Sequence, residues 1–317
     1  MGTVKRIGWR LLLMLPILAL VSVLAFLIGV LTPGDPIEAQ YANRFTAEQL
    51  DQIRATYGLD LPLWQQYFVW LKNVAVDGGG ISIVLGVPVF DILGPNFLNT
   101  LILTLGGVVA CVVFGMAIGA TAGIFHRTWI DRAVMLIVQI GSNLSIYWFG
   151  LVLIIVFSLQ LQWLPVGGMQ SRNGGGFADL LAHLVLPSLA AGLISMLVLA
   201  RFVRIGIIHE VGTEHFKTFA SQGIPRWKLY GKHVGRNILP SAVNITGLEI
   251  GTLITGVIFV ESVFNWPGIG TQLLNAVNGK DYPVIQGGIL LVAACYLVVN
   301  LLTDITVDSL NPRLRRA

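Results

Sequence analysis

The stretch ILGPNFLNTLILTLGGVVACVVFGMAIGATAGIF, residues 92–125, contains no charged side chain in 34 residues. A hydrocarbon core of about 30 Å is crossed by roughly 20 apolar residues in an α-helix. Because lipid offers the backbone no hydrogen-bond partners, a run of this length predicts a transmembrane helix. Within it, Gly115, Gly119 and Gly123 recur at four-residue spacing, which is typical of tight packing between helices.

Three further stretches lack charged side chains, namely Leu11–Gly34, Ala133–Ser171 and Tyr282–Thr303. The chain of 317 residues is 55% hydrophobic and 11% charged, whereas soluble domains carry roughly 25% charged residues. The first stretch exceeds the apolar core of a signal peptide, so we expect it to be retained. We predict an all-α integral membrane protein with six transmembrane helices, near residues 9–31, 97–124, 133–157, 181–204, 239–263 and 284–306.

The placement of lysines and arginines predicts the orientation of these helices. Fifteen of the 20 Lys and Arg side chains lie at one set of helix ends, which includes both termini and the 205–238 loop. Both termini and this loop are therefore expected in the cytoplasm, and the bias explains the net charge of +4 without a nucleic-acid partner. Residues 32–96 then lie outside, where Thr46 and Gln49 have the spacing of a capping box at the start of a short helix.

The motifs of several chemistries are missing from the sequence. No GxxxxGK[ST] P-loop occurs, so we do not expect the chain to bind and hydrolyse ATP in that way. There is no HExxH pair and no cluster of cysteine and histidine that would indicate a metal site. Cys111 and Cys295 both lie in apolar runs and predict no disulfide framework. We therefore expect no catalytic residue, no metal and no cofactor in this chain, which is predicted not to be an enzyme.

An ionisable residue inside a transmembrane helix indicates a functional site, because its burial in lipid is costly. Glu249 lies about ten residues into the predicted helix 239–263, where Thr252 shares its face and Thr255 follows. These side chains either line a pathway for substrate or make hydrogen bonds between helices. Gln139 and Asn143 in the predicted helix 133–157 are weaker candidates for the same pathway.

The stretch HFKTFASQGIPRWKLYGKHVGRNILP, residues 215–240, holds five Lys and Arg side chains and no acid. Phe216, Phe219 and Ala220 form a short apolar face at helical spacing, which would suit a groove on a partner. Gly223 can end such a helix in the left-handed conformation, and Pro225 cannot continue it without strain. The alternative is a solvated basic loop held near anionic lipid.

Several short motifs then follow one another along the chain. They are LTPGDPIEAQ (31–40), YGLDLPLWQQYFVWL (57–71), DGGGIS (77–82), PNFLNTLILT (95–104), QWLPVGG (162–168), HLVLPSLA (183–190), VESVFNWPGIG (260–270), DYPVIQG (281–287) and DSLNPRLR (308–315). By these motifs the chain resembles the oligopeptide/dipeptide branch of binding-protein-dependent transporter permeases. The resemblance extends over residues 1–316.

The resemblance implies the type I fold of ABC importer permeases. An N-terminal transmembrane helix plus an extracytoplasmic segment would cover residues 1–96, and the core transmembrane domain would cover 97–317 with the cytoplasmic coupling loop 205–238. It also implies the partners, which are a second homologous permease, two cytoplasmic ATPase subunits that bind Mg-ATP, an extracytoplasmic substrate-binding protein and membrane lipid. The implied location is the bacterial inner membrane.

In the family that the chain resembles, the cytoplasmic loop forms a coupling helix that docks in a cleft of the ATPase, here near residues 213–224. Phe219 stands where the family motif has a small alanine, and Ala220 stands where arginine is frequent, so we expect a docking groove shaped for a dedicated ATPase. The residues expected to take part in coupling are Phe216, Lys217, Thr218, Phe219, Ala220, Gly223, His233, Arg236, Asn237 and Pro240.

The resemblance favours the import of dipeptides or oligopeptides by alternating access. Relatives also carry nickel or other metal chelates and oligosaccharides, so these cargoes are open alternatives. A secondary transporter or channel, with Glu249 as an ion site, is the alternative of another class. That class would be indicated by an inverted repeat with broken helices, and the sequence shows no such repeat.

Overall fold

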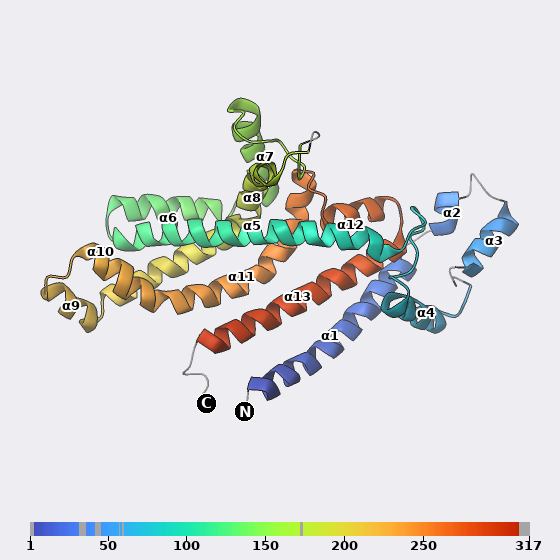
Figure 1. Cartoon of the computed structure of the whole chain (residues 1–317), viewed down its shortest axis with the longest axis horizontal. Coiled ribbons are helices and arrows are strands. Elements are labelled where there is room, and N and C mark those ends of the chain that lie inside the picture. The colour runs from blue at the N-terminus through green and yellow to red at the C-terminus, as the bar shows by residue number, and fades with distance from the viewer. Residues whose placement is uncertain are drawn as a thin grey trace. The chain divides into compact units, whose positions relative to one another are not determined.

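The computed structural model describes residues 3–31, 36–41, 46–56, 58, 60–171 and 174–310. Across these ranges the chain is helical and has no strand apart from one isolated bridge between Ile81 and Pro88 (Figure 1). The predicted all-α class is therefore confirmed. Tyr57 and most of the PGDP motif lie outside the described residues.

Five helical segments are long and apolar enough to cross a membrane. They lie in α1 (Thr3–Leu31), α5 (Val89–Ile124), α8 (Phe177–Val211), the continuous run Arg226–Val263 and α13 (Tyr282–Leu310). The run Arg226–Val263 consists of α10 (Arg226–Lys228), a π-helical stretch η2 (Leu229–Val234) and α11 (Gly235–Val263). All five agree with the predicted positions, and most extend beyond the predicted ends.

The sixth span was predicted as one helix over 133–157, and the structure shows that this segment is broken into two parts. The structure has α6 (Trp129–Gly141), then α7 (Ile146–Leu153) with a π-helical end η1 (Ile154–Gln160), and the two parts meet at an angle of 110°. The Ser142 hydroxyl donates to the Val138 carbonyl, and the Asn143 amide donates to the Gln139 carbonyl at 2.7 Å. Such bonds compete with the helical backbone pattern, and Ser145 is extended just before α7.

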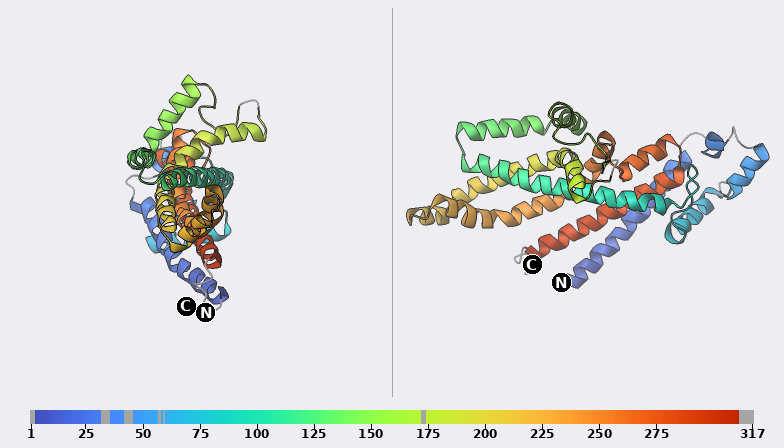
Figure 2. Two further views of the ribbon diagram at one scale, coloured as in Figure 1. Left: turned by 90° about the vertical axis from the view of Figure 1, so that its left-hand side faces the viewer. Right: turned by 45° about the horizontal axis from the view of Figure 1, so that its top comes forward.

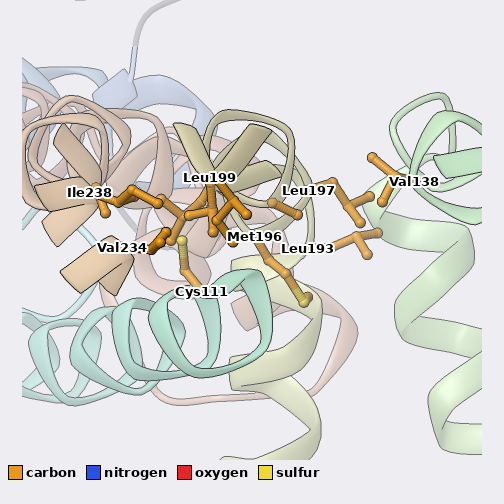
Figure 3. Close-up of a cluster of buried hydrophobic side chains, with 12 residues drawn as sticks. Cys111, Val138, Leu193, Met196, Leu197, Leu199, Val234 and Ile238 are labelled. Atoms are coloured by element: carbon orange, nitrogen blue, oxygen red, sulfur yellow. The ribbon is translucent and has the colours of Figure 1, made fainter. Parts of the chain in front are cut away.

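The described chain separates into two compact units, of which the larger is Leu101–Trp266 with Val299–Ala317. In this unit α8 and α11 lie side by side, and α9 (Glu214–Ser221) and α10 lie beyond their ends (Figures 1 and 2). Buried side chains from α5, α6, α8 and the η2–α11 region meet in one cluster (Figure 3). The unit therefore has a core of its own, which holds its membrane helices together beside the 205–238 loop.

The glycine repeat of α5 packs directly on α8. A Cβ atom added at Gly119 would lie 2.5 Å from the Ala200 carbonyl oxygen, and one at Gly115 would lie 2.9 Å from the Met196 carbonyl oxygen. A Cβ atom at Gly123 would lie 2.8 Å from a side-chain atom of α8. The predicted tight packing is therefore confirmed, and it leaves no room for any side chain along this seam.

The smaller unit comprises Met1–Thr100 and Pro267–Val298. It contains α1, α2 (Pro36–Tyr41), α3 (Ala47–Thr56), α4 (Leu63–Val76), α12 (Ile269–Asn278) and the adjoining parts of α5 and α13. The Asp281 carboxylate accepts hydrogen bonds from the Ser82 hydroxyl and the Ile83 N–H, which fixes the segment before α5 to the turn before α13. The sequence analysis divided the chain at residues 96/97, where the predicted extracytoplasmic segment ends. That division stays a prediction.

Of the two hydrogen bonds that make a capping box, the structure shows the one from the Thr46 backbone to the Gln49 side chain at the start of α3. The Gln49 side chain accepts a hydrogen bond from the Thr46 N–H at 3.0 Å. This return bond fixes the start of α3, as the spacing of the two residues predicted.

Candidate functional site

The 205–238 loop contains a short helix with well-defined ends. α9 begins after Thr213, whose hydroxyl accepts a hydrogen bond from the Phe216 N–H. It ends just before Gly223, which has the left-handed φ of +77°, and Pro225 follows. The sequence predicted this end correctly, because only glycine adopts such a φ without cost. It missed the cap at Thr213, although Thr followed by Glu214 is a common start of a helix.

The two aromatic rings of α9 are in contact with the chain itself. The Phe216 ring packs edge-on against Tyr230, with 5.7 Å between the ring centroids, and the Phe219 ring lies 4.5 Å from that of His233. The sequence favoured a groove on a partner for both rings. The structure shows contacts within the chain that leave both rings half-buried, so their docking on a partner stays a prediction. A two-turn helix beside an apolar core buries its largest rings there first. Both rings therefore seat α9 on η2, and Ala220 is exposed.

A hollow of about 360 Å³ lies between α9 and the helices on which it sits. The Asn237 amide closes one side of it by donating to the Glu210 carboxylate at 2.6 Å, which ties the end of α8 to the start of α11. Five of the residues predicted to take part in coupling line this hollow. Its lining consists of Glu210, His215, Phe216, Phe219, Lys232, His233, Arg236 and Asn237.

The other predicted coupling residues lie on the surface of the same loop. Lys217 forms an exposed ion pair with Glu214 at 2.7 Å, which contributes little to stability in water. Thr218 in α9, Gly223 after it and Pro240 in the second turn of α11 are all exposed. The exposed residues of α9 are therefore polar or small, while the half-buried rings of Phe216 and Phe219 line the hollow.

A buried ion pair lies at the α5–α6 turn and was missed by the sequence analysis. The Arg204 guanidinium donates two hydrogen bonds to the Asp131 carboxylate, at 2.7 and 2.9 Å. The same carboxylate accepts a bond from the Arg127 N–H and lies 3.2 Å from the His126 ring nitrogen. Asp131 is only 4% exposed. A bidentate pair of this kind fixes geometry as well as charge, so it ties α6 to α8.

One signal in the sequence could have indicated this pair. Asp131 is the only acidic residue between Ile92 and Ser171, and it stands among basic residues. An acid in the first turn of a helix is favoured by the helix dipole, and its partner Arg204 follows 73 positions later. The sequence analysis counted Arg127 and Arg204 only among the Lys and Arg side chains at the helix ends.

The residues predicted to line a pathway lie on two different elements. Glu249 is half-buried on α11, and its carboxylate accepts a hydrogen bond from the Ser195 hydroxyl of α8 at 2.8 Å. Thr252 and Thr255 follow on α11 and are exposed. The structure thus contains the interhelical hydrogen bond that the sequence left open as one of two roles for Glu249.

The two weaker candidates for the pathway lie at the end of α6. Gln139 and Asn143 are exposed, and the Asn143 amide is bonded to the Gln139 carbonyl at the break of the span. In the described part of the chain there is no group of three or more His, Cys, Asp or Glu side chains that could hold a metal ion.

These features define a class of protein, an all-helical membrane subunit in which a short helix, α9, is seated on the ends of the membrane helices. Residues 115–316 match the family described as the inner membrane component of binding-protein-dependent transport systems, and residues 4–100 match the N-terminal part of such components. The chain belongs to this family. It is a permease subunit of an ABC importer and not an enzyme.

Named relatives agree with this assignment over the full length. The chain is 37% identical over 306 residues to the glutathione transport system permease protein GsiC of Escherichia coli (strain K12), which covers 96% of this chain and 97% of the relative. The GsiC protein of Shigella flexneri serotype 5b is equally similar. Among solved structures, the inward-facing MetNI methionine ABC transporter matches with a TM-score of 0.59 at 16% identity, covering 71% of this chain and 98% of that one.

The solved structure shares its fold with this chain, so the predicted permease fold is confirmed. Family membership places the chain in the inner membrane as a multi-pass protein that works with an ATPase and a substrate-binding protein. The break between α6 and α7 by itself resembles the broken helices of secondary transporters. Because the family is that of importer permeases, the alternative of a secondary transporter or channel is not supported.

Proposed function

We propose that this permease imports dipeptides or oligopeptides. Glutathione, the substrate named for the Escherichia coli relative, is a tripeptide, and that relative matches 96% of this chain. The half-buried carboxylate of Glu249 and the exposed hydroxyl groups of Thr252 and Thr255 offer polar groups for a peptide. Gln139 and Asn143 are proposed to contribute further polar groups from α6.

The proposed assembly contains a second related permease, two ATPase subunits that bind Mg-ATP, and an extracytoplasmic binding protein. Both chain termini and the 205–238 loop face the cytoplasm in this proposal. The excess of Lys and Arg at this set of helix ends supports the orientation, because positive charge is retained on the cytoplasmic side.

The observation that carries the coupling proposal is the seating of α9. Its two rings pack on Tyr230 and His233, and its cap at Thr213 joins it to α8. The Glu210–Asn237 hydrogen bond links α8 to α11 at the same place. A force applied to α9 is therefore passed to both membrane helices at once.

Alternating access follows from this arrangement. When ATP closes the ATPase pair, α9 moves with the ATPase surface on which it docks. α8 and α11 then move together, because Ser195 and Glu249 also join them within the membrane. Nucleotide shifts the gate only by its different affinity for the two states of the permease.

The assembly is tested by purifying the chain from its native membrane in mild detergent and identifying its partners by mass spectrometry. We expect a second permease and one or two P-loop ATPases. The complex is then reconstituted with the binding protein, and ATP-dependent uptake of glutathione and other small peptides is measured. Uptake of a nickel chelate or an oligosaccharide in place of peptides would contradict the proposed cargo, and a chain that purifies alone would contradict the assembly.

Gly223→Trp tests the docking of the loop. A Cβ atom at this position meets no atom of this chain within 4 Å, and φ is +77°, so the substitution acts at the exposed end of α9, where the partner is proposed to dock. A matched control is Gly86→Trp, where φ is +68° and the Cβ also has no neighbour, on the proposed extracytoplasmic side. We expect loss of uptake for Gly223→Trp alone, with both proteins present in the membrane. Equal uptake by the two variants would contradict the docking role.

A further inference from the structure

The hollow beside α9 has an unusual balance of charge. Lys232 and Arg236 are four residues apart, and both line the hollow from the η2–α11 side. Among the described residues, neither side chain forms a hydrogen bond or an ion pair. Glu210, the one acid among the described residues of the lining, already accepts a hydrogen bond from the Asn237 amide. The described lining therefore holds two cationic side chains, Lys232 and Arg236, and a single carboxylate, which is already hydrogen-bonded.

The remaining lining completes a site for a small organic molecule. His215 and His233 offer ring nitrogens, and Phe216 and Phe219 supply apolar surface. The volume of about 360 Å³ lies within the range of small-molecule sites, roughly 300–1,000 Å³. Lysine and arginine are donors that favour carboxylate and phosphate groups, so a metal cation does not fit this lining.

We propose that this hollow binds a small organic anion, a carboxylate or a phosphate ester, with its charged group against Lys232 and Arg236 and its carbon skeleton on the phenylalanine rings. The walls of the hollow belong to α8, α9 and the η2–α11 region, so an occupant fixes α9 in its seat. Bound anion therefore regulates how the loop transmits force. That consequence rests on the proposed coupling function, whereas the binding itself does not.

The bound carboxylate or phosphate group could be supplied in two ways. A free solute of the cytoplasm can enter the hollow, or an acidic side chain of the docked ATPase can occupy it. Both place a carboxylate or phosphate oxygen between Lys232 and Arg236, and the experiment below separates them.

The test uses the full-length chain in nanodiscs of zwitterionic lipid, with citrate and inorganic phosphate as probes and chloride at equal ionic strength as reference. We expect saturable binding of citrate, measured by calorimetry and by the shift in thermal midpoint. Lys232→Gln and Arg236→Gln are each expected to weaken it by about tenfold, since each removes a charge-assisted hydrogen bond. Lys228→Gln and Arg226→Gln, which remove charges from the same loop outside the hollow, are the controls and are expected to bind as the parent does.

The proposal is overturned if citrate and chloride act alike, or if the control variants lose binding as much as Lys232→Gln and Arg236→Gln. Repeating the titration with the ATPase bound identifies the source. Unchanged affinity assigns the site to a free solute, and displacement of citrate together with weaker ATPase binding by Arg236→Gln assigns it to a partner's carboxylate. Failure of the uptake assays would leave citrate binding measurable, so the two proposals fail separately.

Discussion

The glycine seam between α5 and α8 gives the sharpest quantitative prediction. In the variant Gly119→Ala the new Cβ would lie 2.5 Å from the Ala200 carbonyl oxygen and 2.7 Å from the Val203 Cβ. Ordinary contact begins near 3.4 Å, so α5 must move away by most of 1 Å. The neighbouring glycines at 115 and 123 pack on the same helix, so the whole seam opens and the movement cannot be absorbed locally.

The expected cost follows from these distances. Forcing an extra methyl group into a close-packed interface costs about 1–3 kcal/mol. Alanine gains about 1 kcal/mol over glycine in helix propensity, so we expect a net loss of about 0–2 kcal/mol, with about 1 kcal/mol as the central value. For a chain of this size each 1 kcal/mol lowers the thermal midpoint by roughly 2–4 °C.

The assay is thermal unfolding of the purified importer in detergent at one fixed scan rate, followed by intrinsic fluorescence. Gly94→Ala is the control, since it lies on the same helix and its Cβ would meet no atom within 4 Å. We expect Gly94→Ala to match or exceed the parent and Gly119→Ala to fall below both. A midpoint for Gly119→Ala equal to that of Gly94→Ala would refute the packing argument.

Three further predictions concern other contacts of the larger unit. Asp131→Asn should lower the thermal midpoint, because it leaves Arg204 without its carboxylate; the loss should be smaller than the cost of about 3–5 kcal/mol for a fully buried pair, since the Arg204 side chain is 22% exposed, and an unchanged midpoint would show that the pair contributes nothing. Glu249→Gln and Glu249→Leu should both reduce peptide uptake, while Ser195→Ala, which removes only the interhelical bond, should transport better than either; if both Glu249 variants transport like the parent, the pathway role is lost. Phe219→Ala should lower uptake at constant membrane level by loosening α9 from η2, Phe219→Leu should keep more of it, and equal uptake by all three proteins would argue against the seating.

Much of the fold was predictable because lipid imposes simple rules. The charge-free runs indicated three of the five continuous spans, in α1, α5 and α13, and the apolar stretches between few charges indicated α8 and α11, since hydropathy measures the property that lipid selects. The four-residue spacing of Gly115 and Gly119 indicated close packing against another helix, and the structure identifies that helix as α8. Gly223 indicated the end of α9, because its left-handed φ excludes most other residues.

The missed features depend on contacts that a single sequence does not specify. At the break of the third span, the side chains of Ser142 and Asn143 bond to backbone carbonyl groups of α6. Both residues stand in a charge-free run, so hydropathy alone predicts a continuous helix there. Spacing showed that Phe216 and Phe219 share a face, but not whether that face meets a partner or the chain itself. The pairing of Asp131 with Arg204 joins residues 73 positions apart, beyond the reach of local pattern.

The central claim is that α9 and its exposed end form the contact with the ATPase. A photo-crosslinking amino acid placed at Gln222, the exposed residue that follows α9, tests it in whole cells. The control is the same group at Trp163, which is 70% exposed in the loop before α8. The account predicts that mass spectrometry identifies a P-loop ATPase joined to position 222 and none joined to position 163. Absence of an ATPase adduct at 222, or equal adducts at both positions, would contradict it.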